Sequence, residues 1–204
     1  MRAVIICGGL VSDYDYIKSL VKKDDTVICA DSGYEHALKM GVLVDAVVGD
    51  FDSLGSIPQG VNTVRFPARK NHTDSEIALE YARSKGFSEF LFLGALGGRM
   101  DHTLTNVLML KQTLSRHENA MIADEKNRII ITSSSAEITE PEGSVVSLIP
   151  IEDCKGVTTS GLEYPLLEAD LLVGKGLGVS NVMLTDKAGV SLKSGVLLVV
   201  LAKD

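Results

Sequence analysis

The order of strand-like and helix-like segments is the feature that most constrains the fold of this chain. In the first part, short β-branched runs alternate with amphipathic stretches, so that 3–7 is a predicted strand, 13–23 a predicted helix and 26–30 the next strand. Further strands are expected at 46–49, 62–66 and 90–93, and further helices at 34–40, 73–85 and around 104–114. Strands that alternate with helices predict an α/β domain with a mainly parallel sheet and helices on both faces.

A different pattern begins after Asn119. Short strand-like runs follow one another without helical periodicity, at 129–132, 144–149, 156–160, 171–173, 180–184 and 195–201. Polar turns are expected between them, for example at 139–143 and 186–189. Strands at spacings of roughly 8–12 residues predict a small antiparallel sandwich or barrel. We therefore expect an α/β domain at 1–122 and an all-β domain at 123–204.

Charge and composition argue against several kinds of partner. The 204 residues carry 20 basic and 27 acidic groups, whereas nucleic acids and anionic membranes attract basic surfaces. No apolar run approaches the ~20 residues of a membrane span, and the apolar start is too short for a signal peptide. Cys7, Cys29 and Cys154 show no C-x-x-C spacing, so we expect neither disulfides nor zinc, and a cytoplasmic location.

Acidic residues recur where predicted strands end and predicted helices begin. Five aspartates lie at such places: Asp31, Asp50, Asp52, Asp74 and Asp101. Because loops after parallel strands gather at the carboxyl edge of a sheet, we expect these aspartates to converge there. So much negative charge in one cleft requires compensation, and carboxylate oxygens suit Mg²⁺, which also binds phosphate. The sequence therefore predicts a magnesium-dependent phosphoryl-type transfer at this edge.

Four of these carboxylates also have a simpler interpretation. Asp50 and Asp52 point to the same side of an extended backbone, but D-x-D also occurs in polar turns in which Asp52 or Ser53 caps a helix. Asp74 and Asp101 fall in the first turns of predicted helices, where an acid complements the helix dipole. Only the clustering of several such loops favours metal binding.

A glycine-rich segment supplies positive charge at the same edge. Gly97, Gly98 and Arg99 follow a predicted strand and open a helix. Glycines let a ligand approach the backbone N–H groups, and a guanidinium can bind two phosphate oxygens. Lys70 is a second candidate for phosphate binding, with a solvated surface lysine as the alternative.

Other catalytic patterns are absent or misplaced. The chain lacks the G-x-x-x-x-G-K-[ST] phosphate loop, and the glycines at 174–178 lie among predicted strands, which favours a turn. Ser32 and Ser53 have no identifiable histidine and acid partners, which argues against a serine hydrolase. His72 and His102 lie within the acidic loops and are candidate proton carriers.

Taken in order along the chain, these segments resemble bacterial thiamine pyrophosphokinases. The matching blocks of the first domain are 30–33, 49–53, Lys70 with 73–76, and 97–102. Those of the second domain are 161–166 and 177–181. One departure is the pair Asn71 and His72 after Lys70, where an acidic residue is expected.

The resemblance implies a reaction and a set of site residues. ATP would donate a pyrophosphoryl group to the hydroxyl of thiamine, giving thiamine diphosphate and AMP, with Mg²⁺ as cofactor. The magnesium ligands would be Asp50, Asp52, Asp74 and Asp101, and these four with Arg99 would be the catalytic residues. The ATP-binding residues would be Asp31, Ser32, Lys70, Gly97, Gly98, Arg99 and His102. Ser180 and Asn181 would bind thiamine, in a homodimer with the thiamine site at the subunit interface.

Two other functions fit parts of the pattern. A sugar-nucleotide glycosyltransferase also uses D-x-D after an apolar strand to hold a metal and a diphosphate, but the 97–102 segment and the β domain argue against it. A thiamine- or nucleotide-sensing module would bind ligand without turnover and would have little use for so many carboxylates. For the kinase, we expect Asp101, or else Asp74, to accept the proton of the thiamine hydroxyl.

Overall fold

The computed structural model describes residues 1–51, 60–65 and 72–203. The chain divides into two compact units, Met1–Glu125 and Lys126–Asp204. Among the described residues, no helix combines the length and the apolar character that crossing a membrane requires.

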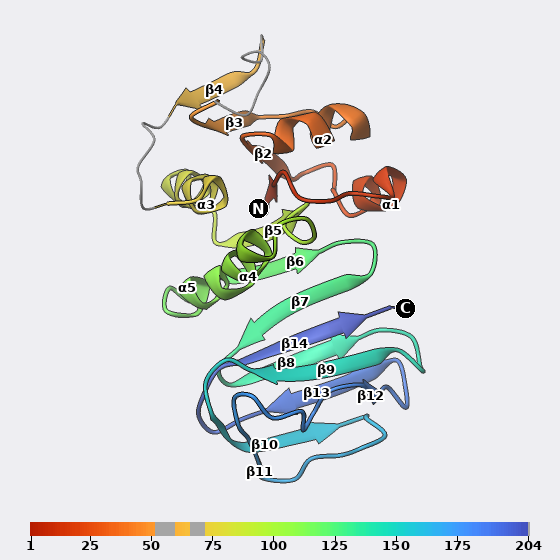
Figure 1. Ribbon diagram of the computed structural model, residues 1–204. Helices are drawn as coiled ribbons and strands as arrows, with labels where there is room; N and C mark the ends of the chain where they lie inside the picture. The colour runs from red at the N-terminus through yellow and green to blue at the C-terminus, as the bar shows by residue number, and fades with distance from the viewer. Residues whose placement is uncertain (52–59, 66–71, 204) are drawn as a thin grey trace. The chain divides into compact units, whose positions relative to one another are not determined.

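The first unit is built on a parallel sheet (Figure 1). Its strands are β1 (Ala3–Ile6), β2 (Thr26–Ala30), β3 (Ala46–Gly49), β4 (Asn62–Arg65), β5 (Glu89–Leu93) and β6 (Asn119–Ala123), in the spatial order β6-β5-β1-β2-β3-β4. The chain moves outward from β1 to β4 and then returns to β5 on the other side of β1. The strand order therefore reverses between β1 and β5, and such a reversal is where open α/β sheets bind ligands.

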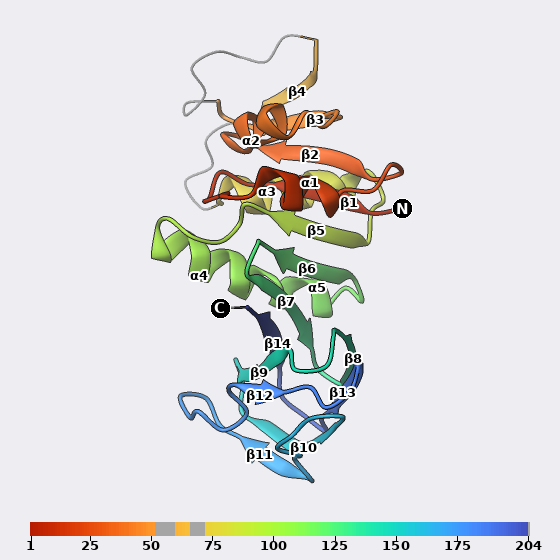
Figure 2. The same cartoon turned by 90° about the vertical axis from the view of Figure 1, so that its right-hand side faces the viewer.

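Helices cover both faces of this sheet, as the alternating pattern predicts. They are α1 (Tyr14–Ser19), α2 (Gly33–Met40), α3 (Asp74–Ser84), α4 (Met100–Met109) and α5 (Lys111–Leu114). Figures 1 and 2 show α1 and α2 on one face and α3, α4 and α5 on the other. Every residue of β1 is fully buried, because side chains on both of its faces pack against helices.

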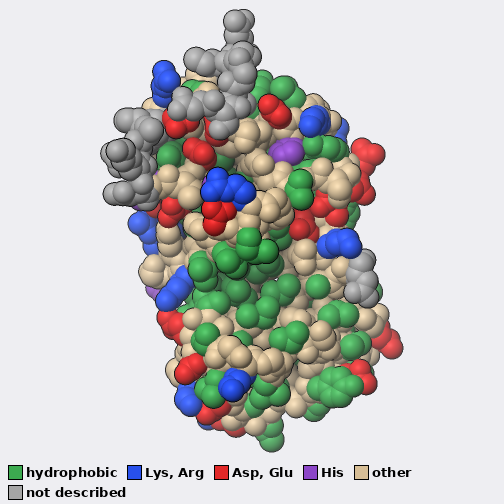
Figure 3. Space-filling view, in the orientation of Figure 1, with side chains coloured by type: hydrophobic (Ala, Val, Ile, Leu, Met, Phe, Trp, Pro, Cys, Tyr) green, Lys and Arg blue, Asp and Glu red, His purple; other side chains and the backbone are tan. Residues whose placement is uncertain are grey.

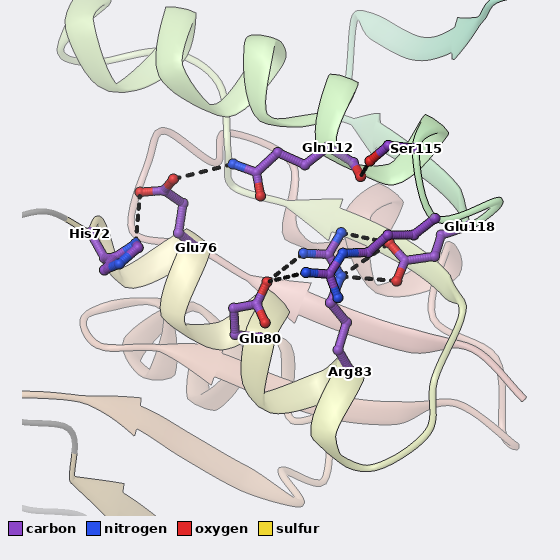
Figure 4. A network of polar contacts seen from close by, with 8 residues as sticks. His72, Glu76, Glu80, Arg83, Gln112, Ser115 and Glu118 are labelled. Atoms are coloured by element: carbon purple, nitrogen blue, oxygen red, sulfur yellow. Dashed lines mark hydrogen bonds and ion pairs between the residues drawn. The ribbon is translucent and has the colours of Figure 1, made fainter.

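Helix α3 is fixed at both of its ends. Thr73 and Glu76 form a capping box, in which the Thr73 side chain accepts from the Glu76 N–H and the Glu76 carboxylate accepts from the Thr73 N–H. In the last turn, Arg83 donates from Nε and Nη2 to the Glu118 carboxylate and from Nη1 to Glu80 (Figure 4). The side chains of Arg83 and Glu118 are only 6% and 8% exposed. The start of α3, which carries Asp74, therefore has a defined position.

The second unit is an antiparallel sandwich, as predicted. One sheet has the order β12-β9-β14-β7 and contains β7 (Asn127–Thr132), β9 (Val145–Pro150), β12 (Asn181–Val182) and β14 (Leu197–Ala202). The other has the order β11-β10-β13-β8 and contains β8 (Ser135–Thr139), β10 (Cys154–Ser160), β11 (Ala169–Leu171) and β13 (Lys187–Ser191). Leu148 and Val199 of the first sheet share a buried core with Val157 and Val190 of the second.

Three predicted elements need correction. The expected helix at 13–23 ends at Ser19, because the Asp25 carboxylate accepts the Lys22 N–H at 2.7 Å and forms a turn there. No strand is predicted at 119–123, where β6 pairs with β5 along its length. The expected turn at 186–189 is wrong, since β13 runs through it as a central strand paired with both β8 and β10.

Candidate functional site

A pocket of about 320 Å³ lies at the carboxyl edge of the first unit's sheet, where the strand order reverses. Its wall is formed by the loops after β1, β2 and β5 and by the start of α3. We call it the first-unit pocket; it is lined by Cys7, Gly8, Gly9, Leu10, Ala30, Asp31, Ser32, Thr73, Asp74, Ser75, Gly94, Ala95, Gly97, Gly98, Arg99, His102 and Asn106. Segments far apart in the sequence thus meet at the place that the topology favours for a ligand.

Two glycines let the loops after β1 and β2 approach each other this closely. A Cβ added to Gly33 would lie 2.0 Å from the Ile6 carbonyl oxygen, and one added to Gly8 would lie 2.0 Å from Ser32 Oγ. At Gly33 no larger residue fits unless the backbone moves, and at Gly8 a larger residue would displace the Ser32 side chain. The glycines therefore serve to bring Ser32 and the β1 loop to the same wall of the pocket.

Asp31 is a buried carboxylate without full hydrogen bonding. It is 3% exposed, and its Oδ1 has no hydrogen-bond partner in the described part of the chain. Its backbone adopts φ +43°, and its N–H donates to the Val48 carbonyl at 2.9 Å, so the surrounding sheet holds it in place. A buried, unpaired anion costs free energy, and the cost is removed when a cation or a hydrogen-bond donor binds.

Asp74 experiences the same excess of negative charge. Burial raises its pKa, and the carboxylates of Asp31 and Asp50 raise it further. Three of the predicted acidic residues are therefore close enough to repel one another, although they come from the loop after β2, the end of β3 and the start of α3. A divalent cation would relieve this repulsion.

The acidic group is incomplete as a metal site in the residues that the structure covers. Within 1–51, 60–65 and 72–203, no three His, Cys, Asp or Glu side chains lie together in a metal-binding arrangement. Asp52, Ser53 and Lys70 fall outside the described residues. The donors that are present, carboxylate oxygens with one unpaired and buried, are of the type that Mg²⁺ prefers.

Arg99 and Asp101 form an ion pair at the rim of the pocket. Arg99 donates from Nη2 to Asp101 Oδ2 at 2.5 Å and from Nε to Oδ1 at 3.1 Å. The side chains are 74% and 63% exposed, so the pair faces solvent. The hydrogen bonds from Arg99 lower the pKa of Asp101, which makes it a weak proton acceptor. Asp101 is thus neutralised by Arg99, whereas Asp31 keeps a buried oxygen without a hydrogen-bond partner among the described residues.

The predicted residues of the first domain fall into three groups. Those that line the first-unit pocket are Asp31, Ser32, Asp74, Gly97, Gly98, Arg99 and His102. Asp50 acts on Asp74 through its charge, and Asp101 reaches the site through Arg99. The two predicted residues outside the described part are Asp52 and Lys70.

Part of the pocket wall lies outside the predicted site residues. Gly8 and Gly9 come one residue after the end of β1, and a glycine pair after the first strand of an α/β domain was the available signal. Asn106 is buried, and its side chain donates to the Ala95 carbonyl at 2.8 Å, which fixes the loop after β5. That contact joins residues distant in sequence, and no local pattern indicates it.

The second unit has its own cavity, of about 280 Å³. We call it the second-unit cavity; it is lined by Tyr164, Leu166, Gly176, Leu177, Gly178, Val179 and Asn181. Tyr164 is 63% exposed and is the aromatic residue of a wall that otherwise consists of aliphatic residues, glycines and Asn181. An exposed aromatic ring beside a cavity is a surface on which a flat or cationic ring can stack.

Asn181 holds Tyr164 in place with its side-chain amide. Its Oδ1 accepts from the Tyr164 N–H at 3.0 Å and from the Val182 N–H at 2.9 Å, and its Nδ2 donates to the Tyr164 carbonyl at 2.7 Å. Because Asn181 is buried, these bonds use most of what the amide can form. Its neighbour Ser180 is exposed, has φ +58° and donates its N–H to Ser147 Oγ.

Comparisons with known proteins agree over both units. The family model described as thiamin pyrophosphokinase, catalytic domain, matches residues 17–123, and that of the vitamin B1 binding domain matches residues 128–197. A thiamine pyrophosphokinase of Bacillus subtilis (strain 168) is 27% identical over 209 residues, 98% of each chain. Thiamin pyrophosphokinase 1 of Caenorhabditis elegans is 25% identical over 82% of this chain and 74% of its own. The crystal structure of thiamine pyrophosphokinase from Bacillus subtilis superposes with a TM-score of 0.90 at 25% identity, covering 100% of both chains.

Proposed function

The chain belongs to the thiamin pyrophosphokinase family, and we propose on that basis that it transfers the pyrophosphoryl group of ATP to the hydroxyl of thiamine. The products are thiamine diphosphate and AMP. The observation that carries this proposal is the first-unit pocket, where a buried unpaired carboxylate, a glycine-rich loop and an arginine meet at the switch point of the sheet. Such a combination suits a metal-bound polyphosphate.

The triphosphate of ATP would lie against the loops of this pocket. Gly97 and Gly98 have φ of +76° and +70° and are exposed, so their backbone lies open to a ligand. Arg99 would exchange its contact with Asp101 for phosphate oxygens, which accept from a guanidinium in the same two-pronged way. Ser32 and His102 would complete the wall, with Lys70 as a second cation.

Carboxylates in and beside the first-unit pocket are the proposed magnesium ligands. Asp50, Asp52, Asp74 and Asp101 would hold the ion, with the unpaired oxygen of Asp31 beside them. When bound, Mg²⁺ would offset the charge of the phosphates and of the departing AMP. The raised pKa of Asp74 and the unpaired buried oxygen of Asp31 support the presence of a cation.

The protein's own contribution to the reaction is positioning and proton transfer. The thiamine hydroxyl oxygen forms a bond to the β-phosphorus, the bond from that phosphorus to the bridging oxygen of AMP breaks, and the hydroxyl proton moves to a carboxylate. Asp101 and Asp74 are the two candidates for this role, and the hydrogen bonds from Arg99, which lower the pKa of Asp101, disfavour Asp101 for as long as that ion pair is kept.

Thiamine would bind at the second-unit cavity. Its positively charged thiazolium and its flat pyrimidine can each stack on the exposed ring of Tyr164, while Leu177 and Val179 supply apolar contact. Asn181, which the sequence predicts as a thiamine ligand, would then act through the backbone of Tyr164. Ser180, exposed at the end of the same loop, keeps its predicted role as a direct contact.

We further propose a homodimer with the thiamine site at its interface, in the cytoplasm. Met100, Leu104 and Leu108 form an exposed apolar stripe along α4, and Figure 3 shows hydrophobic side chains gathered over this helix. Tyr164 and Val179 are exposed in the second unit as well. A second copy would bury such side chains. Light scattering on the purified protein should give the mass of a dimer, and a monomeric mass at micromolar concentration would refute this part.

A single incubation tests the reaction. Purified protein, ATP, Mg²⁺ and thiamine should yield AMP and thiamine diphosphate in equal amounts. Binding of either ligand without AMP would favour a sensing module, and glycosyl transfer from a sugar nucleotide would favour a glycosyltransferase.

A further inference from the structure

We propose that Tyr14 and His36 are positioning residues that set the affinity of the first-unit pocket for nucleotide, by fixing the carbonyl of Gly9. Neither residue lines the pocket, and neither belongs to the motifs on which the family resemblance depends. The inference rests on the proposed ATP site. It is carried by a chain of hydrogen bonds that links two helices to the loop after β1.

The two nitrogens of His36 make two different contacts. His36 lies in α2, and its Nε2 is 2.8 Å from the Gly9 carbonyl oxygen, while its Nδ1 is 2.9 Å from the Tyr14 hydroxyl. A carbonyl oxygen can only accept, so Nε2 carries the hydrogen. In the neutral ring Nδ1 therefore accepts from the Tyr14 hydroxyl, and Tyr14 selects the tautomer that donates to Gly9.

The ring of Tyr14 is itself held. It begins α1, and its centroid lies 5.8 Å from that of His36 at an interplanar angle of 40°. Lys39 Nζ lies 5.6 Å from the centroid of the Tyr14 ring, at the distance of a cation–π contact. The hydroxyl thus reaches Nδ1 from a side chain whose own position is restricted on two sides.

Gly9 is the point at which this chain of contacts meets the pocket. Its N–H donates to the Gly94 carbonyl at 2.7 Å, and the next N–H, that of Leu10, donates to the Leu96 carbonyl at 3.1 Å. A Cβ on Gly9 would lie 2.5 Å from the Gly94 oxygen and 2.6 Å from the Leu96 oxygen, so the loop has no spare room. His36 fixes the carbonyl between these two N–H groups.

The orientation of the Gly9 peptide follows from these contacts. If His36 does not donate, the peptide that joins Gly9 to Leu10 keeps, among the described residues, only the bond from the Leu10 N–H to Leu96, and the backbone of Gly8 to Leu10 that lines the pocket is held less firmly. A phosphate-binding loop works through fixed backbone groups, so such a change weakens the binding of nucleotide. Thiamine, placed at the second-unit cavity, is not affected by this loop.

The test compares four variants by steady-state kinetics and by titration calorimetry with MgATP. H36L removes the donor, H36Q keeps an N–H donor on a side chain of similar reach, and Y14F removes only the hydroxyl. Y16F deletes the hydroxyl of another tyrosine of α1 and is the matched control. One hydrogen bond corresponds to about a 2- to 12-fold change in an equilibrium constant.

We expect H36L to raise the KM and the Kd for MgATP within that range, Y14F to raise them less, and H36Q and Y16F to stay near wild type. The KM for thiamine should be unchanged in all four. The inference is overturned if H36L and Y14F bind MgATP like wild type. It is also overturned if H36L and H36Q both raise the KM for MgATP and the KM for thiamine and lower the melting temperature by the same amount. If the wild type forms no AMP, the proposed reaction fails, while the MgATP titration still decides between these outcomes.

Discussion

Replacing Asp31 with asparagine should make the unliganded protein more stable and weaken its binding of MgATP. In the absence of metal and nucleotide, Asp31 holds a buried oxygen without a partner and a charge that raises the pKa of Asp74. An unsatisfied buried group costs about 1–3 kcal/mol, and more when charged. Asn keeps the shape and tolerates the φ of +43°. We therefore expect D31N to raise the free energy of unfolding by about 1 kcal/mol, or about 2–4 °C in melting temperature.

With MgATP bound, wild type should become more stable than D31N. Wild type is expected to gain about 2.7 kcal/mol at a MgATP concentration 100 times its Kd, whereas D31N lacks the carboxylate and should gain far less. D31A is the control, because it also removes the charge but places alanine in a left-handed conformation that costs roughly 1 kcal/mol more. Melting temperatures of wild type, D31N and D31A, measured with and without MgATP, test both expectations. A D31N protein that is less stable than wild type without ligand, or equally stabilised by MgATP, would refute the reasoning.

The dependence of the free energy of unfolding on acidic pH tests the same repulsion between carboxylates. Because the folded pKa of Asp74 is raised, its ionisation destabilises the fold as pH rises through that pKa, and the penalty disappears below about 3.8, the ordinary value. D74N should therefore be more stable than wild type at neutral pH, with the difference shrinking as pH falls. A difference that is constant with pH, measured by urea unfolding, would contradict this.

Three further variants test other parts of the account. Arg99→Ala should weaken MgATP binding about 10-fold or more and leave thiamine binding unchanged, as measured by separate titrations; equal losses for both ligands would make Arg99 structural. Asn181→Ala should raise the KM for thiamine several-fold without changing that for ATP, because the backbone of Tyr164 loses its hydrogen bonds to the Asn181 side chain. A normal KM for thiamine would contradict this role of Asn181. Arg83→Met leaves Glu118 buried and unpaired and should cost about 3 kcal/mol in urea unfolding with normal KM values, whereas a loss below 1 kcal/mol would argue that water replaces the pair.

Periodicity was sufficient to predict the two kinds of fold, and the order of the motif blocks along the chain indicated the family. The strands at 26–30 and 46–49 and the capped helix that begins after Thr73 are found as predicted, because each is determined by residues within one turn or one strand. Strand order is different, since it depends on which apolar faces pack together across the whole unit. The position of β5 beside β1, which creates the first-unit pocket, comes only from the structure.

Polar strands were the weakest predictions. Strand β13 has the sequence Lys-Ala-Gly-Val-Ser, which is typical of a turn. It is a strand because it lies between β8 and β10, whose backbone groups satisfy its own, and because Val190 reaches the core. Tertiary pairing here overrides local propensity.

The candidate site, like the fold, could be predicted from the sequence only in part. Residue types at strand ends indicated an acidic, phosphate-binding edge, but not the state of each carboxylate. That Arg99 neutralises Asp101 while Asp31 remains unpaired is a matter of side-chain geometry over a few ångströms. The role proposed for Asn181 likewise depends on a contact with Tyr164, 17 residues away in sequence. Motifs therefore indicate where a candidate site lies, and the side-chain contacts distinguish the roles proposed for its residues.

The rate of AMP formation as a function of free Mg²⁺, for wild type and Asp50→Asn, tests the central claim most directly. Wild type should lose activity on chelation and regain it when Mg²⁺ is restored. Asp50→Asn should keep its melting temperature within a few degrees and lose most of its turnover, on the order of 100-fold, even at saturating Mg²⁺. Near-normal turnover of Asp50→Asn at saturating Mg²⁺, or wild-type activity that survives chelation, would contradict the account.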